Sequence, residues 1–190
     1  VLSPLLLVIA LAIRLYDGGP ALYSQVRLTK GHRTFRIYKF RSMVPDAEKD
    51  GARLAAQHDS RITPVGKIIR ATRLDELPQL INILKGDMSI VGPRPERPEI
   101  EAEYLKELPE FGMRLQVQAG LTGYAQVFGK YNTTPEDKLK LDLLYINQRS
   151  LLLDLKLILY TVKIMFIPES TEGVEEGNTT AIRAGSKDKG

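Results

Sequence analysis

The chain has no cysteine, no tryptophan and only two histidines among its 190 residues. The absence of cysteine excludes disulfide bonds, thiolate metal sites and a cysteine nucleophile. His32 lies beside a predicted turn and His58 directly precedes Asp59, which favours solvated loop positions over metal ligands. The sequence therefore argues against a zinc site and against a histidine-based catalytic triad.

The first apolar run, residues 5–15, is shorter than the roughly 20 residues that span a bilayer. It also lacks the basic region and cleavage site of a signal peptide. It fits either part of a membrane-embedded helix or a buried core helix. Ser3-Pro4 slightly favours the membrane interpretation, because proline removes a backbone donor and serine can satisfy the freed carbonyl. The chain begins without methionine close to this run, so we expect it to be part of a longer protein.

The remaining composition is that of one folded domain with a core of ordinary size, at 43% hydrophobic and 26% charged residues. Lys and Arg outnumber Asp and Glu by 27 to 23, and this net charge of +4 suits phosphates, nucleotides or acidic lipid headgroups. The basic residues are scattered without an aromatic platform. This pattern argues against a nucleic-acid-binding domain and predicts no nucleic-acid partner.

The patterning predicts an α/β (α+β) fold in which a small β-hairpin is wrapped by amphipathic helices. Residues 21–29 and 34–43 flank Lys30-Gly31 as two strands of a hairpin. In the second strand Lys39 and Arg41 continue the face that begins with Phe35 and Ile37. Residues 120–129 are expected to form a loop and a short strand. Helices are expected at 45–57, 65–71, from about 75 to Gly86, from the turn at 91–95 to about 108, at 134–148 and at 151–167.

Asp75 and Glu76 are adjacent carboxylates at the start of a predicted helix. Like charges oppose each other's ionisation, so the helix N-terminus, Arg73 or a divalent cation must compensate. Such surroundings would keep Asp75 ionised and nucleophilic. The alternative is purely structural, with Asp75 as an N-cap and Glu76 as a favourable first-turn residue.

Three further residues have side chains that could bind phosphate. Arg94 is held between Pro93 and Pro95, which restrict the backbone and reduce the entropy lost when the side chain binds an anion. An ordinary solvated turn is an equal alternative. Lys39 and Arg41 could clamp a diphosphate, or they could be the wet end of an edge strand.

Asp142 lies on or near the apolar stripe of its predicted helix, beside Leu139 and Leu143. An unpaired carboxylate at such a position would be costly. An arginine partner in the core is the favoured explanation, and a place in a metal or substrate site is the other.

Several long blocks of sequence, taken in order, resemble the bacterial sugar transferase family, the monotopic phosphoglycosyl transferases. The blocks are KFRSM (39–43), RLDELPQLIN (73–82), KGDMSIVGPRP (85–95) and GLTG (120–123), with Gln126 and residues 142–154 extending the similarity. Two positions depart from the family pattern. Tyr124 stands where tryptophan is expected, and Ala119 stands where proline is usual.

The resemblance implies a mechanism and a set of site residues. The aspartate matching Asp75 attacks the sugar-bearing phosphate of a UDP-sugar and releases UMP, and polyprenyl phosphate then displaces the covalently held sugar phosphate, with Mg²⁺ offsetting phosphate charge. Asp75 would also bind the metal, and Glu76 would complete the dyad. The implied substrate-binding residues are Lys39, Arg41, Arg73, Pro93, Arg94, Pro95 and Asp142.

The resemblance also implies a place in the cell and a division of the chain. Residues 1–16 would be the second arm of a re-entrant membrane hairpin, 17–167 the catalytic domain, and 168–190 a flexible polar tail. The domain would contact membrane lipids on the cytoplasmic face of a bacterial inner membrane and initiate exopolysaccharide, capsule or glycoconjugate assembly. A non-catalytic membrane-surface scaffold for glycosyltransferases remains the alternative. The sequence does not fix the sugar or the oligomeric state, and a homo-oligomer stays open.

Overall fold

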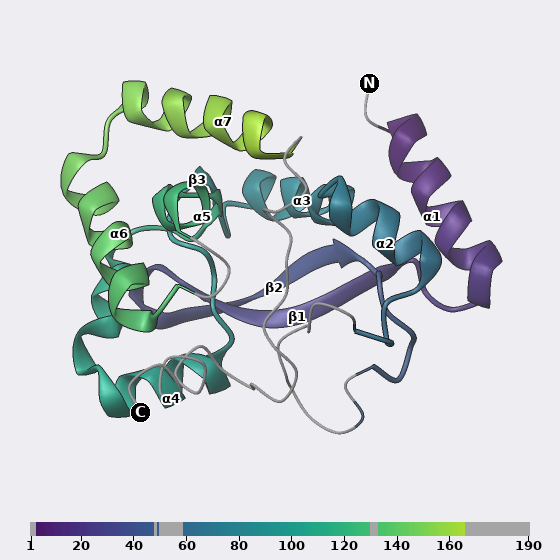
Figure 1. Cartoon of the computed structure of the whole chain (residues 1–190), viewed down its shortest axis with the longest axis horizontal. Coiled ribbons are helices and arrows are strands. Elements are labelled where there is room, and N and C mark those ends of the chain that lie inside the picture. The colour runs from purple at the N-terminus through teal and green to yellow at the C-terminus, as the bar shows by residue number, and fades with distance from the viewer. Residues whose placement is uncertain (1–2, 48, 50–58, 130–132, 166–190) are drawn as a thin grey trace.

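The computed structural model describes residues 3–47, 49, 59–129 and 133–165, and its centre is a long antiparallel hairpin with helices around it (Figure 1). Strand β1 (Leu22–Thr29) pairs with β2 (Arg33–Phe40) over their whole length, in register from Leu22 opposite Phe40 to Thr29 opposite Arg33. The turn η1 (Lys30–His32) joins them, and Gly31 adopts a left-handed φ of 66° there. The predicted hairpin is confirmed. Its second strand ends three residues earlier than expected, and Met43 instead makes an isolated bridge to Ile62.

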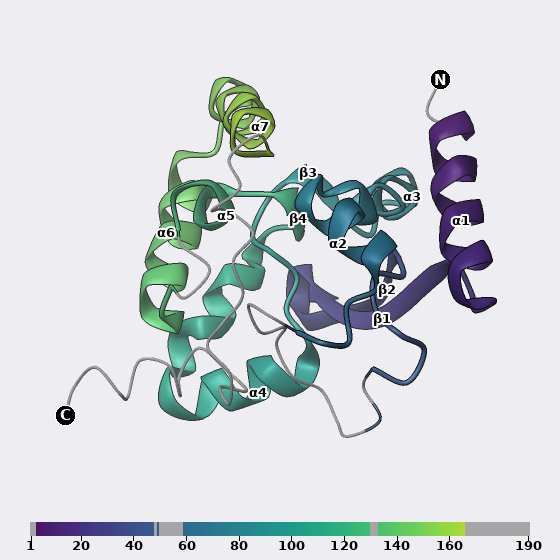
Figure 2. The same ribbon diagram turned by 45° about the vertical axis from the view of Figure 1, so that its right-hand side comes forward.

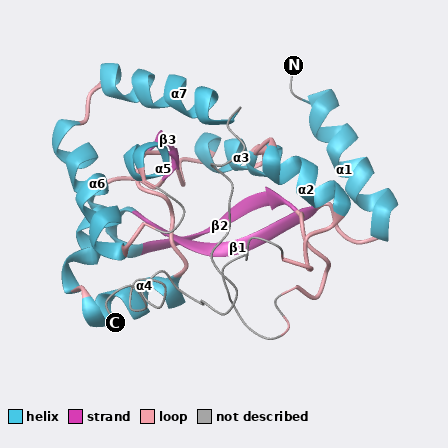
Figure 3. Cartoon of the chain, in the orientation of Figure 1, coloured by secondary structure: helices cyan, strands magenta, loops and turns pink. Residues whose placement is uncertain are grey.

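Helices cover the hairpin and flank it (Figure 3). In chain order they are α1 (Ser3–Asp17), α2 (Pro64–Ala71), the 3-10 turn η2 (Leu74–Glu76), α3 (Gln79–Leu84), α4 (Pro98–Glu107), the 3-10 segment η3 (Pro109–Gln116), α5 (Tyr124–Phe128), α6 (Pro135–Gln148) and α7 (Leu151–Met165). The predicted mixed fold, a small sheet wrapped by helices, is confirmed. Within the described residues, no helix combines the length and the apolar composition needed to cross a bilayer.

Local capping signals set two of the helix starts. Thr63 accepts a hydrogen bond from Gly66 N at 2.9 Å and precedes Pro64, the first residue of α2. Thr134 accepts from Asp137 N at 3.2 Å and precedes Pro135, the first residue of α6. A threonine N-cap followed by proline satisfies a free helix donor and presets the backbone, so these starts agree with the sequence-based prediction.

A second, short sheet lies beside the hairpin. Strand β3 (Ser89–Val91) pairs in parallel with β4 (Gly120–Thr122). The backbones approach so closely here that a Cβ on Gly120 would lie 2.1 Å from Gly92 N, and one on Gly123 would lie 2.0 Å from Gly92 O. Glycine is therefore required at these crossings. The stretch 120–129 was predicted as a loop and a short strand; the strand is present as β4, but residues 124–128 form the helix α5.

The core is divided into small clusters on either side of the hairpin. Ile9 and Ile13 of α1 pack on Phe40 of β2 and Ile69 of α2. Phe35 and Ile37, on the face predicted to be buried, pack on Met88. Two further clusters, centred on Tyr104 with Phe111 and on Tyr145 with Leu157, join α4, η3, α6 and α7. The hairpin thus keeps one face in the core while Lys39 extends that face toward η2.

Two expectations fall partly or wholly outside the described residues. Of the predicted helix at 45–57, only 45–47 and 49 are described, and they form a turn. The predicted tail at 168–190 lies beyond the described part of the chain.

Candidate active site

The two adjacent carboxylates lie in a tight turn that packs against β2, not at the start of a helix. Asp75 and Glu76 belong to η2, which follows Arg73 in a left-handed conformation with φ 54° and ψ 18°. The N-cap of the next helix, α3, is Pro78. The interpretation of Asp75 as the N-cap of this helix is therefore wrong. A non-glycine residue at positive φ is strained, and such strain often marks a functional turn.

Asn82 fixes α3, and with it η2, against the outer edge of β2. Its side chain is fully buried and makes two hydrogen bonds to that strand. The amide oxygen accepts from Tyr38 N at 3.0 Å, and the amide nitrogen donates to Arg36 O at 2.7 Å. Asn82 thus pairs with a strand edge as a third strand would, which places the dyad turn next to Lys39.

Glu76 is held by two cations from different parts of the chain. Its Oε1 accepts from Lys39 Nζ at 2.7 Å and from Arg94 Nη2 at 3.0 Å. Burial alone would raise the pKa of Glu76, but the charges of Lys39 and Arg94 outweigh it and hold that pKa well below its usual range. Glu76 is therefore ionised at neutral pH and serves as the anchor of both cations.

Asp75 has a different environment from its neighbour. Within the described residues, its carboxylate makes no hydrogen bond and no ion pair. Burial raises the pKa of Asp75, and the charge of Glu76 raises it further, while Lys39, Arg70 and Arg94 offset part of this. Positive charge was expected to offset the repulsion between the two carboxylates, and the cations that supply it bind Glu76. Asp75 is left with its oxygens uncommitted, as a nucleophile or a metal ligand requires.

The turn that carries Arg94 is fixed by its own backbone carbonyls. Pro93 O accepts from Gly120 N at 2.9 Å, and Glu96 O accepts from Leu28 N at 3.0 Å. Two arginines, Arg27, which is partly buried, and Arg114, which is fully buried, bind the carbonyls in between. Arg27 Nη1 donates to Pro95 O at 3.1 Å, and Arg114 Nη2 donates to Arg94 O at 2.9 Å. Four consecutive carbonyls are therefore bound from β1, η3 and β4, which holds Arg94 in front of Glu76.

A buried group of charges supports this turn from behind. Arg114 and Asp142, both almost fully buried, form an ion pair at 2.7 Å. Although burial lowers it, the carboxylates of Asp142, Glu96 and Glu101 raise the pKa of Arg114 overall. Glu96 also pairs with Lys138 at 2.9 Å. The arginine partner expected for Asp142 is confirmed, and among the described residues Asp142 is linked to the dyad through Arg114 and the carbonyl of Arg94.

The structure brings together most, but not all, of the residues predicted for the site. Lys39 and Arg94 contact Glu76 directly, and Arg73 lies at the entrance of η2. Pro93 and Pro95 are buried on either side of Arg94. Arg41 lies apart from this group, because its guanidinium donates to Asp17, to Pro20 O and to Met43 O. Its contact with substrate stays a prediction.

Sequence reasoning missed Arg27 and Arg114 as supports of the Arg94 turn. Arg27 was one of several basic residues on an alternating strand, and nothing in its spacing marked it. The one available signal for Arg114 was the carboxylate of Asp142 on an apolar helix face, which required a cation without saying which.

The site leaves little free space and presents few acidic ligands. A cleft beside the dyad, lined by Lys39, Gln79 and Arg94, has a volume of only about 10 Å³. Among the described residues, no three His, Cys, Asp or Glu side chains come together to hold a metal. Mg²⁺ commonly uses only one or two carboxylates together with substrate phosphates and water. The uncommitted carboxylate of Asp75 fits that requirement.

Comparison with known proteins gives a consistent set of relatives. The family model described as bacterial sugar transferase matches residues 1–168. The chain is 44% identical over 164 residues to a protein of Aeromonas hydrophila named UDP-N-acetylgalactosamine-undecaprenyl-phosphate N-acetylgalactosaminephosphotransferase. That alignment covers 85% of this chain and 39% of the relative.

Two other relatives are named for different sugars. The galactosyl transferase CpsE of Streptococcus agalactiae serotype III (strain NEM316) is 46% identical over 163 residues, covering 80% of this chain and 36% of the relative. The UDP-glucose:undecaprenyl-phosphate glucose-1-phosphate transferase of Caulobacter vibrioides is 44% identical over 165 residues, covering 84% of this chain and 62% of the relative. The chain thus spans less than two thirds of the length of each.

Proposed function

Because the chain belongs to the bacterial sugar transferase family, we propose that it transfers a sugar 1-phosphate from a UDP-sugar to undecaprenyl phosphate or a similar polyprenyl phosphate. The names of its relatives support this reaction class. The single observation that carries the proposal is the difference between the two carboxylates of η2. Glu76 binds two cations, whereas the carboxylate of Asp75 has no partner among the described residues.

The proposed reaction is two displacements at one phosphorus. An oxygen of Asp75 attacks the sugar-bearing phosphorus of the donor, an O–P bond forms, and the bond to UMP breaks with its electron pair leaving on UMP. A phosphate oxygen of the polyprenyl acceptor then attacks the same phosphorus. The bond to Asp75 breaks, which restores the carboxylate and yields polyprenyl-diphosphate-sugar. Such covalent catalysis divides one difficult transfer into two easier steps.

The cations around Glu76 have two roles in this scheme. Lys39 and Arg94 both donate to one oxygen of Glu76, so two cationic side chains stand beside the dyad where a phosphate could bind. Arg73 lies close enough for its pKa to be affected by both carboxylates. These side chains would bind the donor's diphosphate beside Asp75 and stabilise the charge that develops on the transferred phosphate.

Mg²⁺ belongs to the proposal through Asp75. When bound there, the ion would offset the charge of the donor phosphates and favour the ionised form of this carboxylate. Glu76 already binds two cations through Oε1, whereas neither oxygen of Asp75 has a partner among the described residues, so Asp75 is the carboxylate proposed to hold the metal.

Placement on a membrane is part of the same proposal, since a polyprenyl acceptor is a lipid. Helices α1, α2, α3 and α7 occupy the upper side of the molecule in two views, away from α4 (Figures 1 and 2). Three of them carry strongly exposed leucines, Leu15 of α1 at 83%, Leu84 of α3 at 88% and Leu151 of α7 at 84%, and α2 exposes Ile68 at 66%. Exposed apolar side chains on neighbouring helices suit a lipid surface. The proposed location is the cytoplasmic face of a bacterial inner membrane, with α1 as part of a re-entrant anchor.

The product would serve as the first intermediate in exopolysaccharide, capsule or glycoconjugate assembly. The relatives are named for N-acetylgalactosamine, galactosyl and glucose transfer. Their similar identities to this chain leave the donor sugar to experiment.

The test is UMP release by the protein in nanodiscs with Mg²⁺ and undecaprenyl phosphate, across a panel of UDP-sugars. We expect release with one sugar or a narrow set of sugars. Asp75→Asn should abolish it, because the amide is a poor nucleophile, while leaving the thermal unfolding temperature near that of the wild type. Asp137→Asn is the matched control, because Asp137 is an exposed acid on α6 that pairs with Lys140, far from the dyad in sequence.

Full activity of Asp75→Asn would contradict the proposal and favour the scaffold alternative, in which the chain binds partner glycosyltransferases without catalysis. Unfolding of Asp75→Asn would instead assign Asp75 a structural role. Asp75→Glu then provides the second test, because it keeps the charge and moves the carboxylate by one methylene.

A further inference from the structure

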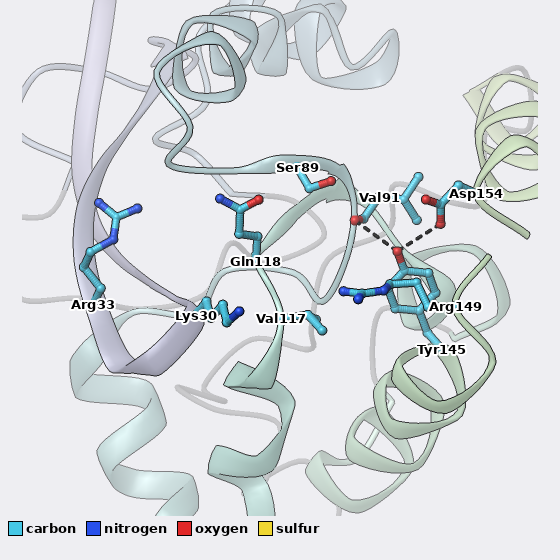
Figure 4. Close-up of a pocket in the computed structure, with 9 residues that line it drawn as sticks. All are labelled: Lys30, Arg33, Ser89, Val91, Val117, Gln118, Tyr145, Arg149 and Asp154. Atoms are coloured by element: carbon cyan, nitrogen blue, oxygen red, sulfur yellow. Dashed lines mark hydrogen bonds between the residues drawn. The ribbon is translucent and has the colours of Figure 1, made fainter. Parts of the chain in front are cut away.

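A second polar pocket lies at the turn end of the hairpin, away from the dyad. Its volume is about 500 Å³ (Figure 4). Val91, Val117 and Tyr145 form a buried floor, and Arg33 of β2 stands at the rim. Arg33 and Lys39 are six residues apart on β2, which is roughly 20 Å along an extended strand. The pocket is therefore separate from the site around Glu76.

Two cations extend into this pocket from opposite sides. In Figure 4 the side chains of Lys30, from η1, and Arg149, from the end of α6, point toward one another above Val117. Within the part of the chain that the structure describes, neither makes a hydrogen bond or ion pair. The hydroxyl of Ser89 on β3 also lines the pocket without a described partner. Each of these three groups can donate a hydrogen bond to a ligand.

The other charged and amide groups of the pocket already have partners. Arg33 pairs with Asp87 at 3.1 Å. The Asp154 carboxylate accepts from the Tyr145 hydroxyl at 2.9 Å. The Gln118 amide nitrogen donates to Gly86 O at 2.8 Å. Lys30 and Arg149, which are both exposed, therefore have no carboxylate partner among the described residues, and both are available to an anion that enters the pocket.

We propose that this pocket is a second anion site and binds a phosphate-bearing ligand between Lys30 and Arg149. A guanidinium can bind two phosphate oxygens at once, and the ammonium of Lys30 and the hydroxyl of Ser89 supply donors from other directions. The volume falls in the range of small-molecule pockets, roughly 300–1,000 Å³, and exceeds what orthophosphate alone would fill. The ligand is thus a phosphate with a substituent, either a soluble phosphate ester or a lipid headgroup.

The test follows the accessibility of Lys30 to an amine-acetylating reagent, read by mass spectrometry of its peptide. Pyrophosphate, UMP and vesicles containing phosphatidic acid are titrated against the whole protein, with phosphatidylcholine vesicles as the neutral comparison. The proposal predicts slower acetylation of Lys30 with at least one phosphate-bearing probe. Lys106, an exposed lysine of α4, is the internal control and should be unaffected.

Variants then show which residues are needed for a ligand to protect Lys30 from acetylation. Arg149→Gln should raise the ligand concentration needed to protect Lys30 by roughly tenfold, as expected for loss of one charge-assisted hydrogen bond. Arg36→Gln removes an exposed arginine of β2 outside the pocket and should change nothing. Arg94→Gln, which alters the dyad site, should also leave protection of Lys30 intact.

The probes separate the two sources of phosphate. Protection by pyrophosphate or UMP identifies a soluble ligand, and protection only by phosphatidic acid vesicles identifies a lipid headgroup. Equal acetylation of Lys30 with and without every probe at millimolar concentration would overturn the proposal. Protection that disappears in Arg94→Gln and persists in Arg149→Gln would overturn it as well, because the anion would then be bound at the dyad.

Discussion

At the scale of single residues, Asp75 and Glu76 are adjacent carboxylates that have different partners and opposite pKa shifts. Glu76 receives both Lys39 and Arg94 on one oxygen, and the same charges hold its pKa down. Asp75 is one residue away but faces no donor among the described residues, and burial raises its pKa. Two like groups with pKa values shifted in opposite directions are typical of sites where one carboxylate binds and the other reacts.

The buried pair of Arg114 and Asp142 gives the first residue-scale prediction. Asp142→Leu alone should lower the free energy of unfolding by about 3–5 kcal/mol, because it leaves the charge of Arg114 buried without its partner. The double variant Arg114→Met, Asp142→Leu should recover most of that loss in a chemical denaturation experiment. Its transferase activity should stay low, because Arg94 O has lost its donor.

Recovery of both stability and activity in the double variant would contradict the role of Arg114 as a positioning residue. Loss of both would show that the charge pair is required for folding itself.

Glu101 gives the second prediction, which concerns pH. Burial raises its pKa from 4.5 to about 7, and neither carboxylate oxygen has a hydrogen-bond partner among the described residues. A raised pKa of an acid in the folded state means that the folded chain keeps a proton that the unfolded chain releases. The free energy of unfolding should therefore fall as pH rises from about 4.5 to 7, by up to roughly 3 kcal/mol from this group.

Glu101→Gln should remove this fall, as measured by urea denaturation at several pH values. Glu103→Gln on the same helix is the control and should keep the slope of the wild type. If Glu101→Gln and the wild type lose stability in parallel across that window, Glu101 is not the group responsible.

At the scale of elements, the sequence predicted those structures whose signals are local. Alternation of apolar residues and the Lys30-Gly31 turn predicted the hairpin, and a threonine cap followed by proline predicted the start of α6. Helix α3 is the exception, because its apolar residues do not form its buried face. Ile81 and Leu84 are exposed, whereas Gln79 and Asn82 are buried. Hydrogen bonds from Asn82 to β2, 44 and 46 residues away, decided this orientation, and no local pattern contains that contact.

In the candidate site, too, some features were predicted from the sequence and others were not. The dyad, Lys39 and Arg94 were predicted from charge patterning and the resemblance to the family. The carbonyl contacts that hold Arg94 were not predicted, because they join β1, η3 and β4 through backbone groups that every residue carries. Such contacts depend on the fold and leave no residue-specific signal in the sequence.

Gly66 gives a prediction at the element scale, where helix propensity and packing oppose one another. In an exposed helix, Gly→Ala stabilises by about 1 kcal/mol. At Gly66 of α2, however, a Cβ would lie 1.9 Å from the backbone oxygen of Ser42. Backbone atoms cannot move aside as a flexible side chain can, so we expect Gly66→Ala to destabilise the protein by about 2 kcal/mol.

Thermal and urea unfolding measure this change directly. Lys67→Ala at the next, exposed position is the matched control and should stay within about 0.5 kcal/mol of the wild type. A stabilised Gly66→Ala variant would mean that α2 and Ser42 are farther apart than described.

At the scale of the whole molecule, the polar and apolar surfaces are unevenly distributed among the helices. The side with α1, α2, α3 and α7 carries many of the exposed leucines, and α7 buries only Leu157 among its apolar residues. A helix with one buried residue gains little from packing on the domain. A lipid surface on its other side would supply that gain.

Vesicle co-sedimentation tests this surface. Leu151→Ser with Leu155→Ser on α7 should reduce partitioning to anionic vesicles at least tenfold, because each leucine loses roughly 1.5–3 kcal/mol of apolar burial. Both side chains are exposed, so the fold should be retained. Met113→Ser, at an exposed apolar position on η3, is the control and should bind as the wild type does. Equal binding of all three proteins would exclude α7 as the membrane contact.

The central claim is that Asp75 carries the transferred sugar phosphate, and intact-mass measurement tests it most directly. The protein is incubated with its UDP-sugar and Mg²⁺ in the absence of polyprenyl phosphate, and its peptides are then sequenced by mass spectrometry. The account predicts one added sugar phosphate on the peptide containing Asp75, one equivalent of UMP, and loss of the adduct when acceptor is added. UMP release that requires both substrates together, with no adduct on Asp75, would contradict it.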